Sequence, residues 1–203
     1  RMGQPKASLP FGETTALGLI LETCQEAGLR AALVIAGADE VAVRAAAAPF
    51  ANARIVMHIE WNAGRTSSIK AGLAALGAVG DRPVPDDVLL WPVDCCLPGR
   101  DVIQALQAAR AAHPQALAWI PSCAQRRGHP ALLSPVAAAR IAALGPDESA
   151  RRVIHALADE GSLFHVDVLD PSVLMNMNTP EDYTHWLHAY ASASTDSETE
   201  GSP

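Results

Sequence analysis

An aspartate follows the apolar run that is most typical of a buried strand in this chain. Residues 88–93 are continuously apolar, acidic residues precede them, and Asp94 comes directly after. Such a run favours a central strand that is covered on both faces. Ligands of open parallel α/β sheets bind at the carboxyl ends of the strands, so a carboxylate at this position can meet a bound nucleotide and its cation. The alternative is that Asp94 only caps the helix that follows.

Basic residues with glycine open the chain and suit a phosphate. The segment Arg1-Met-Gly-Gln-Pro-Lys6 places a glycine between two cations. Glycine lets backbone amides approach a phosphate closely, and flanking cations add charge without a Walker motif; no GxxxxGK(S/T) occurs here. A solvated basic terminus is the alternative.

Two further segments carry cations beside groups that can bind anions. Gly64-Arg-Thr-Ser-Ser-Ile-Lys70 opens a predicted helix, where Ser67 and Ser68 could contact a nucleotide and Arg65 or Lys70 could add charge. Helix capping explains Thr66 and Ser67 equally well. Gln125 to Pro130 is a turn that carries two arginines and an imidazole, and an ordinary surface turn is its alternative.

Composition narrows the class of protein. The 203 residues are 49% hydrophobic and 18% charged, which suits one large domain with a single core. No apolar segment approaches the ~20 residues that cross a bilayer, so we expect a cytoplasmic protein without a membrane partner. Four cysteines without CxxC pairs predict reduced thiols. Cys95-Cys96 could form a soft-metal site, although packing in a strand-to-helix corner is the simpler prediction. A net charge of -7 argues against a nucleic-acid surface.

The elements that must position these residues alternate along the chain. We expect helices over residues 17–27, 39–48, 67–76, 101–113, 136–144 and 148–158, and strands over 31–36, 53–60, 88–93, 116–121 and 164–169. Alternation of this kind predicts an α/β domain in which helices cover a mostly parallel sheet.

The last helix has a clear start. Thr179 is the expected N-cap, Pro180 the first helical residue and Asp182 the residue that completes a capping box. Beyond residue 190 the chain is small, polar and acidic. We therefore predict one domain over residues 1–190 and a disordered tail over 191–203.

Five segments taken in order resemble a known family. RMGQPK from Arg1, GRTSSIKAGL from Gly64, WPVD ending at Asp94, GHPALLS from Gly128 and NTPEDY from Asn178 resemble the MobA-like nucleotidyltransferases, and are most similar to the molybdenum cofactor cytidylyltransferase branch. The resemblance covers residues 1–187. It implies a three-layer, doubly wound, Rossmann-like fold that transfers a nucleoside monophosphate from a triphosphate to a phosphorylated acceptor, with Mg²⁺ as cofactor and pyrophosphate as product.

The resemblance also implies partners and alternatives. The substrates would be CTP and a phosphorylated pterin cofactor. A related branch would use GTP or UTP with another phosphorylated small molecule. A non-catalytic carrier of a nucleotide or cofactor is the alternative from a different class.

Site residues follow from the matching motifs. The resemblance implies catalytic roles for Arg1, Lys6 and Asp94, and a metal site at Asp94 and Asn178. It implies nucleotide contacts from Arg1, Gly3, Pro5, Lys6, Gly64, Ser67 and Ser68, and acceptor contacts from Arg126, Arg127, Gly128, His129 and Pro130.

The chain departs from the family at two places. No hydrophobic strand of the LAAGxSx kind precedes RMG, so we expect upstream residues. The alternative is a truncated, inactive chain, because a sheet without that strand would lose an internal member and expose the ladders on both sides. The branch has Asp-x-Asp where this chain has Asn176-Met-Asn178. Asn178 is the preferred second ligand, and with one carboxylate we expect little metal to bind before the triphosphate. The alternative is that both asparagines merely turn the chain.

Overall fold

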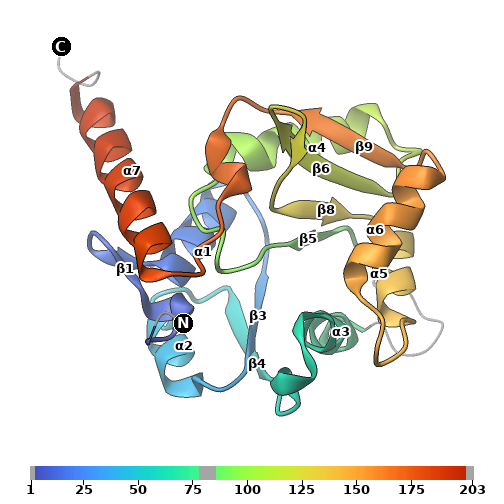
Figure 1. Cartoon of the computed structure of the whole chain (residues 1–203), viewed down its shortest axis with the longest axis horizontal. Coiled ribbons are helices and arrows are strands. Elements are labelled where there is room, and N and C mark those ends of the chain that lie inside the picture. The colour runs from blue at the N-terminus through green and yellow to red at the C-terminus, as the bar shows by residue number, and fades with distance from the viewer. Residues whose placement is uncertain (1–2, 78–85, 200–203) are drawn as a thin grey trace.

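The structure, a computed structural model, describes residues 3–77 and 86–199 and has an α/β architecture (Figure 1). Its helices are α1 (Ala16–Glu26), α2 (Glu40–Ala47), α3 (Arg65–Ala75), α4 (Arg100–Ala112), α5 (Pro135–Ala142), α6 (Ala150–Asp159) and α7 (Pro180–Thr199), with short 3-10 turns η1 (Lys6–Ser8), η2 (Trp61–Ala63) and η3 (Pro171–Leu174). Its strands are β1 (Pro10–Phe11), β2 (Thr14–Thr15), β3 (Ala32–Ala36), β4 (Ala53–Met57), β5 (Val88–Leu90), β6 (Ala118–Cys123), β7 (Arg126–Arg127), β8 (Ala131–Leu133) and β9 (Leu163–Asp167).

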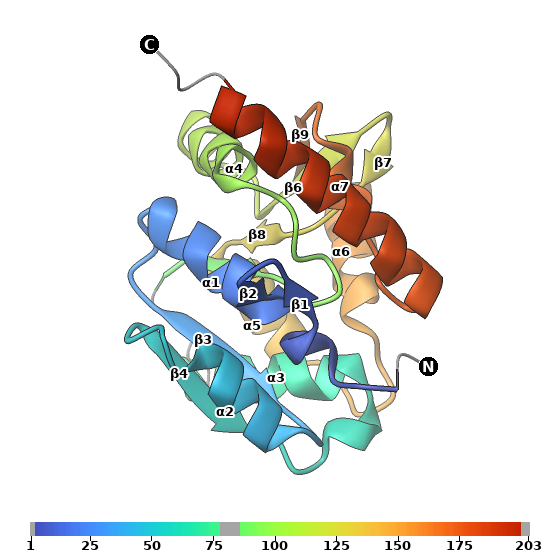
Figure 2. The same ribbon diagram turned by 90° about the vertical axis from the view of Figure 1, so that its left-hand side faces the viewer.

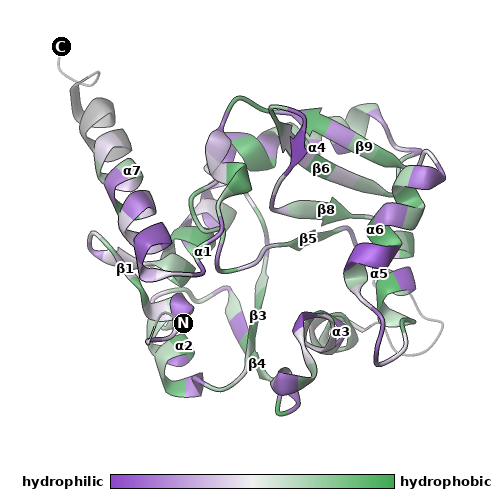
Figure 3. Cartoon of the chain, viewed as in Figure 1, coloured by the Kyte–Doolittle hydropathy of each residue, from purple (hydrophilic) through white to green (hydrophobic). Residues whose placement is uncertain are grey.

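The larger sheet forms the middle of three layers. Its order is β5-β8-β6-β7, with β9 on the other side of β6. Side chains alternate along β6, so Ala118 and Ile120 pack with α3, α5 and α6, whereas Trp119 packs with α4 on the opposite face. The hydrophobic colour follows β6 and β8 in Figure 3, as expected of strands buried on both faces.

The expected α/β class is confirmed, but the sheet is mixed rather than mostly parallel. β6 and β9 run parallel, whereas β8 runs antiparallel to both β5 and β6. Ala124 and Gln125 have φ values of 48° and 61°, and they form the tight turn that reverses the chain between β6 and β7. A reversal this short can only produce antiparallel neighbours. We did not predict β8, whose short GHPALLS segment lacks a strand-length pattern.

β3 and β4 form a separate parallel pair, from Ala32 opposite Ala53 to Ala36 opposite Met57. Within residues 3–77 and 86–199, β3 has a ladder only with β4, and β5 only with β8. Each of these two strands therefore has one edge without a ladder among the described residues. The predicted central strand 88–93 is correspondingly wrong in two respects: it ends at Leu90, and its residues are only half-buried. Pro92 has no N–H to donate to a ladder.

Helix α1 connects the two parts (Figure 2). Leu17 and Leu21 pack with β3 and α2, while Ile20 and Cys24 pack with the segment after β5. This spacing is the i, i+3, i+4 pattern of an amphipathic helix with two buried faces. Apolar burial on both faces therefore joins the β3–β4 pair to the rest of the domain.

Helix α7 begins as predicted. Thr179 Oγ1 accepts a hydrogen bond from Asp182 N at 3.2 Å, and Asp182 Oδ2 accepts from the backbone N–H groups of Asn178 and Thr179, each at 2.9 Å. Its apolar side holds Tyr183 and Tyr190 against Phe11, with ring centroids 5.6 Å apart in both pairs.

Helix α7 extends to Thr199, so residues 191–199 are helical where we expected disorder; residues 200–203 of the expected tail lie outside the described residues. Ala and Ser dominate this stretch and include no helix-breaking residue before Gly201. Among the described residues, no helix has both the length and the apolar character needed to cross a bilayer.

Candidate active site

Asp94 is the centre of the candidate site. The residue is only 6% exposed. Its Oδ2 accepts a hydrogen bond from Arg65 Nη2 at 3.1 Å and lies 3.6 Å from Lys6 Nζ. Helix α4 has Gly99 as its N-cap, so Asp94 does not cap that helix, and the capping alternative is wrong. Two cations therefore contact one buried carboxylate. A buried charge is tolerated when oppositely charged groups pair with it, as they do here.

Lys6 joins Asp94 to a third segment. Its Nζ donates a hydrogen bond to Asn178 Oδ1 at 2.9 Å, across 172 residues of sequence. Backbone bonds hold both partners in place: Met177 N donates to Asp94 O at 3.0 Å, and Asn178 N is held by the first turn of α7. Lys6, Asp94 and Asn178 thus come together from η1, from the segment after β5 and from the start of α7.

The side chains around Asn178 alternate between core and surface. Met175 and Met177 are buried against Cys95 and Cys96, while Asn176 and Asn178 are exposed. Of the two asparagines, Asn178 is the one whose side chain is bonded within this cluster. Asn178, the asparagine preferred from the sequence, thus shares Lys6 as a partner with Asp94.

The GHP turn lies close to the same cluster. A Cβ on Gly128 would be 2.4 Å from Val173 O, and His129 N donates to that carbonyl at 2.8 Å, so glycine lets the turn pack against η3. Burial lowers the pKa of His129 from its ordinary value of 6.5; the Asp94 carboxylate opposes this shift and the Arg65 guanidinium adds to it. The neutral ring therefore lies within the electrostatic reach of the site, and its buried Nδ1 has no hydrogen-bond partner among the described residues.

The N-terminus of α3 contributes Arg65 rather than hydroxyls. Thr66 Oγ1 accepts from Ala150 N at 3.1 Å, and Ser67 Oγ donates to Gly64 O at 2.7 Å, so both hydroxyls have structural partners. Lys70 donates to Leu144 O, away from Asp94. Arg65 is the residue of this segment that reaches the carboxylate; the sequence offered it only as an alternative to Lys70 for adding charge, and did not predict its bond to Asp94. Its position at the first residue of α3, directly after Gly64, was the signal for it.

The other predicted residues have the following places. Gly3 is exposed with a φ of 72°, Pro5 and Ser68 are half-buried, and Pro130 is buried beside His129. Arg126 and Arg127 are exposed on β7 and have no recorded contact with Asp94. Gly64 has a φ of 107°, a value that glycine adopts without strain. Arg1 lies outside the described residues.

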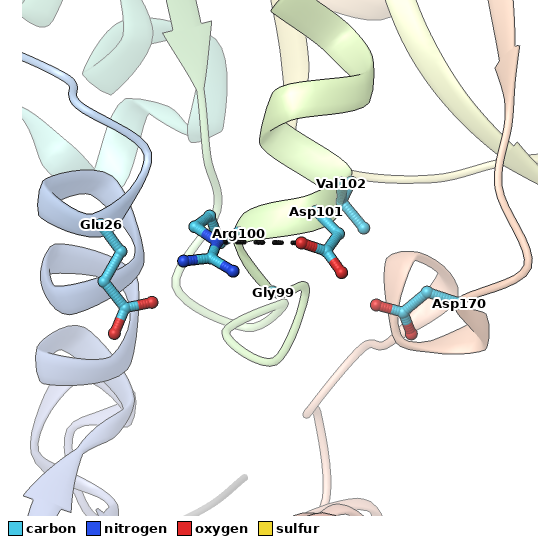
Figure 4. Close-up of a pocket in the computed structure, with 6 residues that line it drawn as sticks. All are labelled: Glu26, Gly99, Arg100, Asp101, Val102 and Asp170. Carbon is cyan, nitrogen blue, oxygen red and sulfur yellow. Dashed lines mark ion pairs between the residues drawn. The ribbon is translucent and has the colours of Figure 1, made fainter.

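A crevice adjoins Lys6 at the carboxyl end of β3. Its volume is about 170 Å³, and it is lined by residues 5–7, by Val93 and by the segment that leaves β3 at residues 34–39. This is where α/β sheets bind their ligands. A larger hollow of about 470 Å³ lies elsewhere, between α1 and the start of α4 (Figure 4). Glu26, Asp101 and Asp170 line it with one cation, Arg100, so its charge repels a triphosphate.

The residues present fit a small divalent cation. Asp94 Oδ2 and Asn178 Oδ1 both lie next to one atom, Lys6 Nζ, so one ion can reach both oxygens. Mg²⁺ and Mn²⁺ favour oxygen ligands, and Mg²⁺ commonly takes one or two protein ligands together with water and phosphates. Among the described residues, no cluster of three or more His, Cys, Asp or Glu side chains could hold a metal.

The cysteines beside Asp94 are core residues. Burial raises the pKa of Cys95 and Cys96 to about 12 in both cases, so both remain protonated thiols at neutral pH. Cys95 Sγ donates to the carbonyls of Ser172 and Val173 at 3.6 and 3.7 Å. Packing in the strand-to-helix corner is thus confirmed, and a soft-metal site would need thiolates that this environment disfavours.

Comparison with known proteins identifies the family. The model of the MobA-like NTP transferase domain matches residues 1–161. The chain belongs to this family. No curated protein matches the MobA-like chain significantly.

Solved structures share the fold of this MobA-like domain. A homologue of Mycobacterium tuberculosis Rv0371c from Mycobacterium sp. strain JC1 is 22% identical, with a TM-score of 0.74, 95% of this chain and 91% of that chain covered. Rv0371c of Mycobacterium tuberculosis, solved in complex with manganese, is 24% identical, with a TM-score of 0.68 and coverage of 92% and 94%. A nucleotidyl transferase from Methanothermobacter thermautotrophicus is 19% identical, with a TM-score of 0.75 and coverage of 93% and 86%. These likenesses agree with the Rossmann-like fold expected from the sequence.

Proposed function

We propose that this chain transfers CMP from CTP to the phosphate of a molybdopterin-type cofactor and releases pyrophosphate, with Mg²⁺ as its metal. The observation that carries the proposal is the convergence of Lys6, Asp94 and Asn178 beside the crevice at the carboxyl end of β3. Family membership supports the reaction class, and the GHPALLS segment and the order of the motifs support the branch, although Asn176 and Asn178 depart from its Asp-x-Asp pattern.

The reaction needs positioning and charge more than covalent help. An oxygen of the acceptor phosphate attacks the α-phosphorus, the bond between that phosphorus and the bridging oxygen breaks, and pyrophosphate leaves with the electron pair. Lys6 binds the triphosphate oxygens, and Asp94 and Asn178 hold the metal. Mg²⁺ bound there neutralises negative charge on the phosphates. The expected phosphate contacts of Arg1, Gly3 and Pro5 belong to the same proposal.

The acceptor binds on the side of the GHP turn. Desolvation favours the neutral form of His129, whose ring offers one hydrogen-bond donor and one acceptor. Arg126 and Arg127 precede it on exposed β7 and supply positive charge for an anionic acceptor. Gly64, Ser67 and Ser68 remain proposed contacts of the nucleotide at the start of α3. The Ser67 hydroxyl already donates to Gly64 O, so it would contact the nucleotide as a hydrogen-bond acceptor.

Manganese in the Rv0371c complex supports a divalent ion in this fold. The same geometry fits a transferase that uses GTP or UTP with another phosphorylated small molecule, because the cluster binds phosphates and not the base. Four free cysteines favour a reducing compartment, and we place the protein in the cytoplasm.

The test is release of pyrophosphate from CTP, GTP, UTP or ATP, with Mg²⁺ or Mn²⁺ and a phosphorylated pterin acceptor. We expect turnover with CTP that depends on both metal and acceptor. Thermal denaturation in the same mixtures reports binding separately, because a ligand of the folded state raises its apparent stability. Stabilisation by a nucleotide without pyrophosphate release from any pair of substrates would identify a carrier, and turnover with GTP alone would overturn the cytidylyl assignment.

A further inference from the structure

A single ammonium group bridges the two oxygens that would hold the metal. Lys6 Nζ donates to Asn178 Oδ1 at 2.9 Å and lies 3.6 Å from Asp94 Oδ2. The Lys6 side chain is 27% exposed and that of Asp94 9%, so the pair is shielded from bulk water on the carboxylate side. A metal ion ligated by the same two oxygens would share the space that this ammonium occupies.

A second cation is bonded to the same carboxylate oxygen. Arg65 Nη2 donates to Asp94 Oδ2 at 3.1 Å, although the Arg65 side chain is 68% exposed. Asp94 is the anionic member of the cluster, since Asn178 contributes a neutral oxygen. Lys6 and Arg65 together therefore more than compensate the charge of Asp94, and a divalent ion approaching this net positive cluster meets repulsion.

We propose that Lys6 occupies the metal position in the nucleotide-free protein, and that the triphosphate opens this position by drawing the ammonium onto its own oxygens. This inference rests on the proposed function. It makes Lys6 a positioning residue with two partners: Asp94 and Asn178 before the nucleotide binds, and phosphate afterwards. The nucleotide and the metal then bind with positive coupling, and by linkage each raises the affinity for the other.

The same arrangement stabilises the buried Asp94 carboxylate before a metal binds. A buried carboxylate without a partner costs free energy, and Lys6 and Arg65 supply partners while no metal is bound. Asn178 supports the same arrangement. Its neutral side chain accepts a hydrogen bond from Lys6 without adding a charge that would attract metal in the absence of nucleotide.

The test measures Mn²⁺ binding to the full chain without nucleotide or acceptor, by the loss of the free Mn²⁺ signal in electron paramagnetic resonance. Lys6→Met keeps most of the aliphatic stem and removes the charge. We expect it to tighten Mn²⁺ binding about ten- to hundredfold relative to wild type, the scale of one hydrogen bond to a charged group. Arg65→Gln removes the other cation and should give a smaller gain.

Three matched variants separate local exchange from bulk charge. Lys6→Arg keeps the charge and should bind Mn²⁺ as weakly as wild type. Arg44→Gln removes one charge from α2, where Arg44 pairs with Glu40, and should change Mn²⁺ binding less than twofold. Lys6→Met combined with Asn178→Ala should lose most of the gain, because the released oxygen is absent.

Unchanged Mn²⁺ binding in folded Lys6→Met and Arg65→Gln, or an equal gain in Arg44→Gln, overturns the inference. Circular dichroism verifies that each variant is folded. Because these measurements contain neither nucleotide nor acceptor, their outcome is independent of pyrophosphate release: a carrier can show the gain, and an active transferase can lack it.

Discussion

At the scale of single residues, burial decides what each polar group can do. Asp94 is buried with its charge compensated by Lys6 and Arg65. His129 is half-buried, its buried Nδ1 has no partner among the described residues, and desolvation favours its neutral form. Cys95 and Cys96 are buried as thiols. Burial thus leaves Asp94 charged because two cations compensate it, whereas it favours the neutral forms of His129, Cys95 and Cys96.

Asp94→Asn tests the carboxylate with little change of shape. We expect the rate of pyrophosphate release to fall at least about 10²- to 10³-fold, the usual cost of removing one electrostatic group from an active site. The melting temperature should change little, because Lys6 and Arg65 are partly exposed and can be solvated without Asp94. Calorimetric unfolding is the control, and near wild-type turnover by the folded variant would remove Asp94 from the site.

The lowered pKa of His129 predicts how stability depends on pH. Burial favours the neutral ring in the folded protein, so the unfolded chain takes up the proton first as pH falls through about 6.5. The contribution of His129 to the free energy of unfolding is therefore constant above that pH and decreases below it.

Urea denaturation at pH 7.5, 6.5 and 5.5 measures this effect. Wild type should lose more stability across the range than His129→Gln, which cannot be protonated. Parallel losses in the two proteins would show that this imidazole titrates alike in both states.

At the scale of elements, the site residues come from short segments that lack a clear helical or strand pattern in the sequence. Lys6 comes from one 3-10 turn, the GHP segment packs on another, and Asn178 precedes α7. Regular helices and strands hold these segments by a few backbone contacts, such as the bond from Met177 N to Asp94 O. The precision of the site therefore depends on close packing where segments meet.

Gly128→Ala tests the contact between the GHP turn and η3. The added Cβ would lie 2.4 Å from Val173 O, which is backbone and cannot rotate away. We expect a loss of about 1–3 kcal/mol in the free energy of unfolding, the usual cost of overpacking, and weaker use of the acceptor at intermediate temperature.

Gly99→Ala is the matched control, because a Cβ there meets nothing within 4 Å and the residue has a φ of −81°. It should lose less than about 1 kcal/mol, the scale of an altered N-cap. Equal losses in the two variants would show that the close approach at Gly128 is not a constraint.

At the scale of the whole molecule, the backbone ladders of the β3–β4 pair and of the larger sheet form two separate units. Side-chain packing joins the two units. β6 pairs with strands on both sides, whereas β3 and β4 pair only with each other within the described residues. Helix α1 packs against both units, and α3 likewise contacts β3 in the smaller unit and α5 in the larger one. The candidate crevice lies on the smaller unit beside Lys6, so the nucleotide would bind where the two units meet.

Hydrogen exchange should reveal these units. We expect the amides of Ala118 to Cys123 in β6 to exchange most slowly, and those of β3 and β4 to exchange faster through local opening. Mass spectrometry of peptides after timed labelling provides the measurement. Uniform protection across both units would contradict a division of this kind.

The sequence by itself determined the features that depend on neighbouring residues. Helix starts at Ser134 and Thr179, the helix end near Gly28 and the alternation of helices and strands all rest on local hydrogen bonds and local apolar spacing, and the structure has them. The motif order sufficed to indicate the family and its Rossmann-like fold.

Only the tertiary structure decided which of the candidate residues meet. Sequence spacing could not show that Lys6 bonds Asn178 across 172 residues, that Arg65 rather than Lys70 reaches Asp94, or that the Ser67 hydroxyl donates to Gly64 O. It also missed antiparallel β8, and it overestimated the burial of residues 88–90. Periodicity and capping signals act over a few residues, whereas the direction of a side chain and the covering of a strand depend on distant segments packed against it.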